Sequence, residues 1–157
     1  MLYFSRLKKE DLHKYSRLVR PEVNFEDYYC HKTLLKEWNN IQSYVLMNEE
    51  REWIGWCAVS SQTNVCNPNG SNIIGSVIFP KFRNKGYAKY LYKIIFEKTA
   101  GKNKLVRINP FNDALKKISE RYGFTPHQTC DIWNTYCCKS KDCPKELKEL
   151  CLTEVNL

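Results

Sequence analysis

The chain has 157 residues, of which 43% are hydrophobic and 27% charged; this suits one globular domain and excludes a disordered, collagen-like or coiled-coil chain. Its 25 Lys and Arg against 17 Asp and Glu give a charge of +8, which attracts nucleic acid, anionic lipid or phosphorylated small molecules without choosing among them. No apolar run could span a membrane and no secretory signal is evident, so we expect a cytoplasmic protein. We expect a single domain over residues 1–157, with its core in residues 2–139 and a C-terminal extension over 140–157.

Hydrophobic periodicity and turn residues predict the elements of the first half. In chain order they are the strand Leu2–Leu7, the helices Lys8–Val19 and Phe25–Trp38, the strands Ser43–Met47 and Trp53–Ser60, and the loop Asn64–Asn72. The second half continues with the strand Ile73–Phe79, the basic loop Pro80–Lys85, the helix Gly86–Thr99, the strand Leu105–Ile108, a helix from the N-cap Asn112 to Tyr122, the strand Thr129–Cys138, and a helix or turn over Pro144–Leu152.

The order of these elements predicts the fold class. Strand, loop, helix and strand between Ile73 and Ile108 have the order of a right-handed βαβ crossover, whereas the earlier strands favour antiparallel pairing. We therefore predict an α+β fold with three α/β layers, in which helices flank a mixed, mostly antiparallel central sheet. Only one strand is predicted after Phe124. The last edge of the sheet is thus expected to be short, or to be completed by another subunit in a homodimer.

The segment from Val77 to Ala88 carries the features of an anion site. A buried strand leads into a basic loop, and the loop ends with Gly86 at the start of a helix. The first turn of a helix has N–H groups without partners and the positive end of the helix dipole, and glycine lets a ligand approach the backbone. Arg83 and Lys85 add positive charge. A phosphate fits such a site, although an ordinary tight turn before an amphipathic helix has the same local pattern.

The spacing Arg83-x-x-Gly86-x-Ala88 resembles the acyl-CoA pyrophosphate loop of the GNAT superfamily of N-acetyltransferases, whose usual pattern is Gln/Arg-x-x-Gly-x-Gly/Ala. It is neither a Walker A motif nor a dinucleotide-binding Gly-x-Gly-x-x-Gly. The helix that begins at Asn112 and the pair Gly123-Phe124 are similar to the later motif of the same superfamily. The order of elements agrees with that fold over about Leu2 to Lys139, with the βαβ crossover forming the acyl-CoA site.

The resemblance implies roles for particular residues. Val77 and Phe79 would offer backbone groups to the pantetheine arm of acetyl-CoA, and Asn112 would contact the arm from the other side. The pyrophosphate would be held by Arg83 and by the backbone N–H groups of the loop, which belong to Asn84, Lys85, Gly86, Tyr87 and Ala88. Acetyl-CoA would then be a co-substrate, and no metal is expected.

The implied reaction is acyl transfer from the thioester to an amine, and its catalytic groups are harder to assign. Members of the superfamily often have a tyrosine four residues before the Gly-Phe pair, but this chain has Ser119 there. Ser119 would either hydrogen-bond the leaving sulfur or hold a water; the alternative is an ordinary surface hydroxyl. Tyr122 has the register of a core residue.

The sequence does not identify a single general base. Glu52, His31 and His127 are candidates, each with a structural alternative, and a water-relayed base is a further one.

Two further functions compete with acyl transfer to an amine. The missing tyrosine, together with the lack of a carboxylate in Ile73–Phe79, suggests a domain that binds acyl-CoA but has lost transfer. The basic charge suggests a nucleic-acid-associated module, although no known RNA-binding motif is present. The sequence does not select the acceptor, which is a small molecule, a peptide or a nucleic-acid-linked amine. No membrane partner is expected.

Cysteines raise one more question, which is a metal site. The chain has eight cysteines but no Cys-x-x-Cys pair. A zinc site would draw on four of the five cysteines of the C-terminal third, at irregular spacings: Cys130, Cys138, Cys143 and Cys151. Reduced structural thiols are the default expectation.

Overall fold

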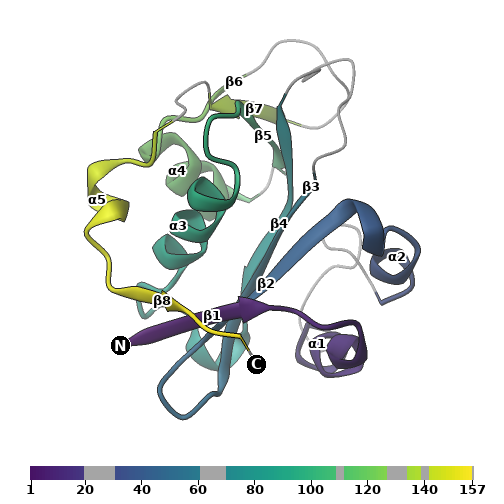
Figure 1. Cartoon of the computed structure of the whole chain (residues 1–157). Coiled ribbons are helices and arrows are strands. Elements are labelled where there is room, and N and C mark those ends of the chain that lie inside the picture. Colours follow the sequence, from purple (N-terminus) through teal and green to yellow (C-terminus); the bar gives the residue numbers. More distant parts are fainter. Residues whose placement is uncertain (20–30, 61–69, 109–111, 127–133, 139–141, 157) are drawn as a thin grey trace.

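The fold is a mixed sheet with helices on both faces (Figure 1). This computed structural model describes residues 1–19, 31–60, 70–108, 112–126, 134–138 and 142–156. Within these ranges eight strands lie in the order β6-β7-β5-β4-β3-β2-β1-β8. The pairs β4–β5 and β1–β8 are parallel, and the other neighbours are antiparallel. The predicted fold class is confirmed.

The strands are β1 (Leu2–Arg6), β2 (Ile41–Met47), β3 (Trp53–Ser60), β4 (Ser71–Ile78), β5 (Lys104–Ile108), β6 (Thr125–Pro126), β7 (Asn134–Cys138) and β8 (Leu152–Glu154). The α-helices are α1 (Leu12–Val19), α2 (His31–Lys36), α3 (Ala88–Lys98), α4 (Asp113–Arg121) and α5 (Lys145–Lys148). Three short 3-10 helices complete the described elements: η1 (Lys9–Asp11), η2 (Trp38–Asn40) and η3 (Pro80–Phe82).

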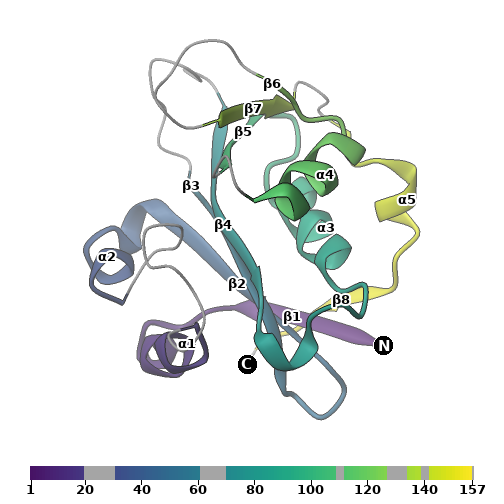
Figure 2. The same cartoon turned by 180° about the vertical axis from the view of Figure 1, so that it is seen from behind.

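The sheet separates two hydrophobic layers, because alternate side chains of a strand point to opposite faces. One layer contains the buried face of α3 together with Leu46, Phe124 and Leu147. The other lies on the side of α1 and α2 and contains Tyr15 and Trp56, whose ring centroids are 4.8 Å apart. Figures 1 and 2 show this division, with α3, α4 and α5 on one face and α1 and α2 on the other.

Most predicted elements match the structure to within a few residues. The strand Trp53–Ser60 coincides with β3, and α3 begins two residues after Gly86. The predicted helix Phe25–Trp38 is represented by α2, and its residues 25–30 lie outside the described ranges. Likewise, the strand predicted over Thr129–Cys138 is described only as β7.

The prediction for the end of the chain missed two strands, β6 and β8, and was right about a helix after Pro144. The short strand β6 follows Phe124, and β7 pairs with β5 along all of its described residues and with β6 on its other side. This half of the sheet thus ends in the two-residue strand β6 of the same chain, as expected for a short edge, and the homodimer stays a prediction. Pro144–Leu152 holds the single-turn helix α5, and β8 then begins at Leu152.

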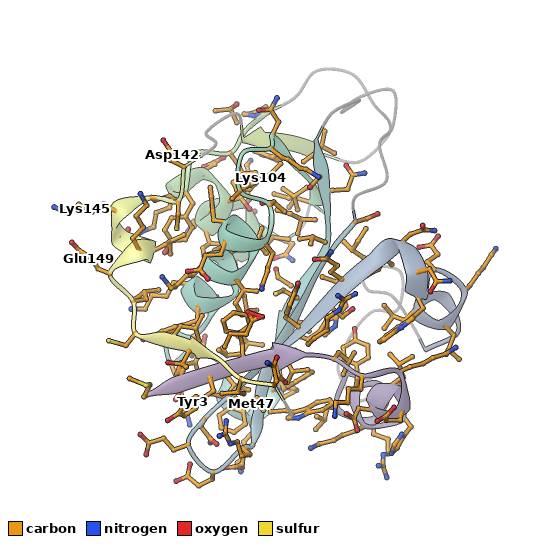
Figure 3. The ribbon with its side chains drawn as sticks, viewed as in Figure 1. Tyr3, Met47, Lys104, Asp142, Lys145 and Glu149 are labelled. Atoms are coloured by element: carbon orange, nitrogen blue, oxygen red, sulfur yellow. The ribbon has the colours of Figure 1, made fainter. Side chains whose placement is uncertain are left out.

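The segment after residue 141 packs into the fold. β8 pairs in parallel with β1, and Lys98 of α3 donates two hydrogen bonds of 2.7 and 2.8 Å to the Glu154 carboxylate. Leu147 of α5 is wholly buried, whereas Lys145 at the start of α5 and Glu149 just after its end point outward (Figure 3). Apolar packing, an edge pairing and ion pairs, all with residues distant in sequence, hold this segment. Local periodicity reports none of them.

Candidate active site

The parallel strands β4 and β5 part at the middle of the sheet. Their pairing covers only Ser71–Ile73 of β4, although β4 continues to Ile78. The parting begins at a β-bulge, because the register between β3 and β4 shifts so that Ile74 is an extra residue. A bulge bends its strand and increases the local twist. Beyond it, β4 has no described partner on its β5 side.

Backbone groups on that open side belong to Ser76 and Ile78. In an antiparallel ladder, every second residue directs both its N–H and its C=O to the same neighbour. The Phe79 N–H donates to the Ile54 carbonyl at 2.9 Å, and Val77 lies opposite Trp56 in the same register, so both direct their groups to β3. The expectation that Val77 and Phe79 supply these groups therefore needs correction, because β3 already engages them.

The loop after β4 combines residues of positive and negative φ, as anion-binding nests do. Asn84 and Gly86 have positive φ angles of 62° and 81°, and Tyr87, the N-cap of α3, is right-handed helical. Left- and right-handed residues in succession direct consecutive N–H groups toward one point. A Cβ added at Gly86 would meet no heavy atom within 4 Å, so the space before this backbone is open. The predicted loop residues from Asn84 to Ala88 are thus brought together at the start of α3.

Several contacts fix this loop. The rings of Phe82 and Tyr87 meet edge to face, with centroids 6.3 Å apart, and both pack on the α3 side of the core. The Arg83 Nε donates to the Ile78 carbonyl at 2.9 Å. Lys85 is exposed, and α3 has no acidic residue in its first turn. The loop therefore combines a defined backbone with positive charge (Figure 2 shows the turn between β4 and α3).

Asn112 caps α4 as predicted. Its side-chain Oδ1 accepts a hydrogen bond from the Leu115 N–H at 3.1 Å. The cap fixes the beginning of α4, which follows β5 after residues 109–111, outside the described ranges. Its predicted contact with the pantetheine arm stays a proposal.

The structure places Ser119 in the interior instead of beside an open site. Its side chain has no exposed area, and its Oγ lies 2.7 Å from the Tyr92 hydroxyl of α3. Burial raises the pKa of the Tyr92 phenol well above its usual range, so the phenol stays protonated. Tyr122 is buried against Tyr92, with ring centroids 5.4 Å apart, which confirms its predicted core position. We therefore interpret the Ser119 hydroxyl as a link between α3 and α4, not as the predicted catalytic group.

Glu52 is an exposed ion-pair partner in this structure. Its carboxylate accepts hydrogen bonds from Lys81 at 2.8 Å and from Asn48 at 3.1 Å. These bonds, that of Lys81 first, lower the pKa of Glu52, which makes it a weaker base. The side chain of His31 and all of His127 lie outside the described parts of the chain.

Sequence reasoning missed two features of the site. The parting at Ile74 depends on a bulge that no residue type announces. The helix that carries Tyr92 is predicted from the sequence, but the partner of the Tyr92 hydroxyl lies on α4, 27 positions away in the chain. A buried tyrosine usually has a hydrogen-bond partner, so its phenol was the available signal.

Among the described residues, no helix is long and apolar enough to cross a membrane, and no three or more His, Cys, Asp or Glu side chains are placed to hold a metal ion. Cys130, one of the four possible zinc ligands, lies outside these residues, and Cys143 and Cys151 are free thiols.

Comparisons with solved structures identify similar folds. A spermidine N-acetyltransferase from Vibrio cholerae in complex with CoA and spermine has a TM-score of 0.64 at 14% identity, covering 87% of this chain and 92% of its own. A dodecameric structure of the Vibrio cholerae spermidine N-acetyltransferase has a TM-score of 0.63 at 13% identity, covering 87% and 91%. At these identities the likeness shows a shared fold.

The family follows from the sequence. No curated protein gives a significant match. The model of the acetyltransferase (GNAT) family, however, matches residues 9–124, a range that contains the parted strands, the loop before α3 and the Gly123-Phe124 turn. This chain therefore belongs to the acetyltransferase (GNAT) family and is by class an N-acetyltransferase.

Proposed function

We propose that this protein transfers an acetyl group from acetyl-CoA to an amine of a small-molecule, peptide or nucleic-acid-linked acceptor. The observation that carries the proposal is the open edge of β4, which ends at the loop before α3. The edge offers backbone hydrogen bonds for an extended arm with amide groups, and the loop offers N–H groups for phosphates. Acetyl-CoA contains both chemistries in this order.

The donor would lie with its diphosphate at the loop and its arm along β4. Ser76 directs its N–H and C=O to the open side, and Ile78 directs its N–H there, while the Ile78 carbonyl accepts from Arg83. The amides of the arm would pair with the groups of Ser76 and with the Ile78 N–H. The diphosphate would accept from the N–H groups between Asn84 and Ala88, with Lys85 adding charge. Asn112 would approach the arm from the side of α4. The thioester would then reach the gap between β4 and β5.

Transfer requires that the acceptor amine lose a proton when its nitrogen attacks the thioester carbonyl and the CoA thiolate departs. Ser119 is buried with Tyr92, and Glu52 is paired with Lys81, which makes both poor candidates for the proton transfers. We propose that water relays the proton from the amine. The net charge of +8 favours an anionic donor, and it disfavours an acceptor that carries several positive charges.

A matched pair of glycines tests the donor site. Gly86 and Gly101 have φ angles of +81° and +78°, and a Cβ at either one would meet no heavy atom within 4 Å. Gly86→Ala and Gly101→Ala should therefore lower the free energy of unfolding by a similar amount, about 1 kcal/mol, through backbone strain alone. Only Gly86→Ala should weaken CoA binding, by tenfold or more (about 1.4 kcal/mol), because its methyl group enters the phosphate space.

Calorimetric titration with CoA and acetyl-CoA, together with thermal unfolding of each variant, measures both effects. Equal CoA affinities of the two variants would contradict the proposed site, and a folded wild-type protein that binds no CoA would contradict the donor. Thioester consumption with a panel of amines then tests transfer. Normal CoA binding without consumption for any amine would instead indicate a domain that binds acyl-CoA without transferring it.

A further inference from the structure

The peptide group between Ile78 and Phe79 is held from both sides. Its carbonyl oxygen accepts from the Arg83 Nε at 2.9 Å, and its N–H donates to the Ile54 carbonyl of β3 at the same distance. Two hydrogen bonds in opposite directions fix the orientation of a peptide plane. This peptide lies where the open edge of β4 ends. Its orientation therefore determines where the last backbone hydrogen-bonding groups of that edge point.

The chain reaches this arrangement through one tight turn. Phe79 is extended, as a residue before proline must be, and Pro80 starts η3. The Phe82 N–H returns to the Phe79 carbonyl at 2.9 Å, and the Arg83 N–H to the Pro80 carbonyl at 3.3 Å. This turn brings the half-buried Arg83 side chain back to a carbonyl five residues earlier. The side chain thereby joins the strand end to the loop that holds Asn84 and Gly86.

We propose that Arg83 is a positioning residue for the pantetheine arm: by holding the Ile78 carbonyl, it fixes the register in which an amide-bearing ligand pairs with the open edge of β4. This inference rests on the proposed donor site and assigns one of its residues a different task. The Ile78 carbonyl is occupied by the guanidinium, so an arm pairs with the groups before it. The thioester is then placed at a constant depth in the gap between β4 and β5.

Positive charge at the loop has other sources. Lys85 is exposed in the loop itself, and Lys89 follows in the first turn of α3. The bond from the Arg83 Nε, by contrast, needs an N–H group at that place in the side chain, which lysine lacks. Arg83→Lys therefore keeps the charge and removes the hydrogen bond to Ile78. Lys85→Met removes a charge and leaves that bond in place.

Two fragments of CoA separate the two tasks. Pantetheine has the arm without phosphate, and 3′,5′-ADP has two of the three phosphates of CoA, at the 3′ and 5′ positions of the ribose, without the arm. In NMR titrations of the full chain, Arg83→Lys should weaken pantetheine binding about tenfold and leave 3′,5′-ADP within twofold of wild type, since a hydrogen bond to a charged group has about that effect. Lys85→Met should show the reverse pattern. In the unliganded protein, Arg83→Lys should also shift the carbonyl ¹³C resonance of Ile78.

The outcomes are distinguishable. A loss confined to 3′,5′-ADP would make Arg83 a phosphate ligand and overturn the inference. Equal losses of both fragments, unchanged affinities, or an unshifted Ile78 carbonyl resonance would overturn it as well. Thermal unfolding of each variant shows that the protein under titration is folded. If wild-type protein binds no CoA, the proposed function itself fails; if it binds CoA and Arg83→Lys keeps its pantetheine affinity, only this inference fails.

Discussion

The pairs β2–β3 and β4–β5 show two ways of using neighbouring strands. β2 pairs with β3 along its whole length, from Ile41 to Met47. β4 pairs with β5 only from Ser71 to Ile73, and its remaining residues have no described partner on that side. Both pairs contribute residues to the α3-side core, so burial alone does not distinguish them. The two pairs differ in how much of their backbone is paired between the two strands.

This comparison shows how the fold reconciles stability with binding. Unpaired backbone groups in a sheet are costly unless they find a partner, so a completely paired sheet has few polar groups for a ligand. Here the bulge at Ile74 ends one ladder early, while β3 continues to support β4 from its other side. β4 is therefore paired with β3 on one side and open to a ligand on the other side beyond Ile73.

The largest expected effects distinguish the paired strands β2 and β3, which support the fold, from the open edge of β4, which is proposed to bind CoA. Leu46→Ala removes a wholly buried side chain and should lower the free energy of unfolding by about 3 kcal/mol. Gly55→Ala should lower it by about 2 kcal/mol, because the new Cβ would lie 2.7 Å from the Val77 carbonyl oxygen. Only the second change should also weaken CoA binding, since it displaces β4 next to its open edge. Denaturant unfolding and calorimetry measure the two quantities.

Leu46→Ala is the control in this pair, because Leu46 lies on β2, which pairs with β1 and β3 and not with β4. If both variants bind CoA as wild type does, the open edge does not depend on its support from β3. If Leu46→Ala weakens binding as much as Gly55→Ala does, the distinction between supporting strands and open edge is wrong.

A medium effect is expected at the link between α3 and α4. Tyr92→Phe and Ser119→Ala each remove one partner of a buried hydrogen bond, and each should cost about 1–2 kcal/mol of stability. The double variant should cost less than the sum, because neither partner is then left unsatisfied. If Ser119 is not catalytic, acetyl transfer per folded molecule should be unchanged in Ser119→Ala. A large loss of turnover with normal folding would restore its catalytic role.

The smallest effect concerns the ion pair beside the loop. Lys81 lowers the pKa of Glu52, so Lys81→Met should raise it toward its ordinary value. A lowered pKa in the folded state adds stability above the unfolded-state pKa, and this stability is lost as the pH falls through the lowered value. Both side chains are exposed, so the gain is small. A ¹³C titration of the Glu52 carboxyl measures the shift; an unchanged pKa would show that the pair does not persist in solution.

Much of the fold could be predicted because its signals are local. The apolar spacing of Leu91, Tyr92 and Ile95 identified α3, and Asn112 identified the start of α4 by its capping chemistry. The loop before α3 was found from the spacing of Arg83 and Gly86. Each of these signals extends over less than a dozen residues.

The rest depends on contacts between distant residues. The direction of the Val77 and Phe79 backbone groups follows from register with β3, and a shift of one residue reverses it. Ser119 was judged from its position relative to Gly123-Phe124, but the Tyr92 hydroxyl on another helix decides its role. β8 is a strand only because β1 has an edge to pair with.

The parallel pair of β1 and β8 has a consequence for the order of folding. Leu2 pairs with Leu152 and Phe4 with Glu154, so the outermost ladder joins residues 150 positions apart. Contacts of such high sequence separation form late, because the loss of chain entropy on closing a long loop precedes the gain from pairing. During synthesis, this edge of β1 stays unpaired by β8 until almost all of the described chain has been made. A nascent chain lacking its last residues would expose a strand edge, and it is then that the protein is most prone to aggregate.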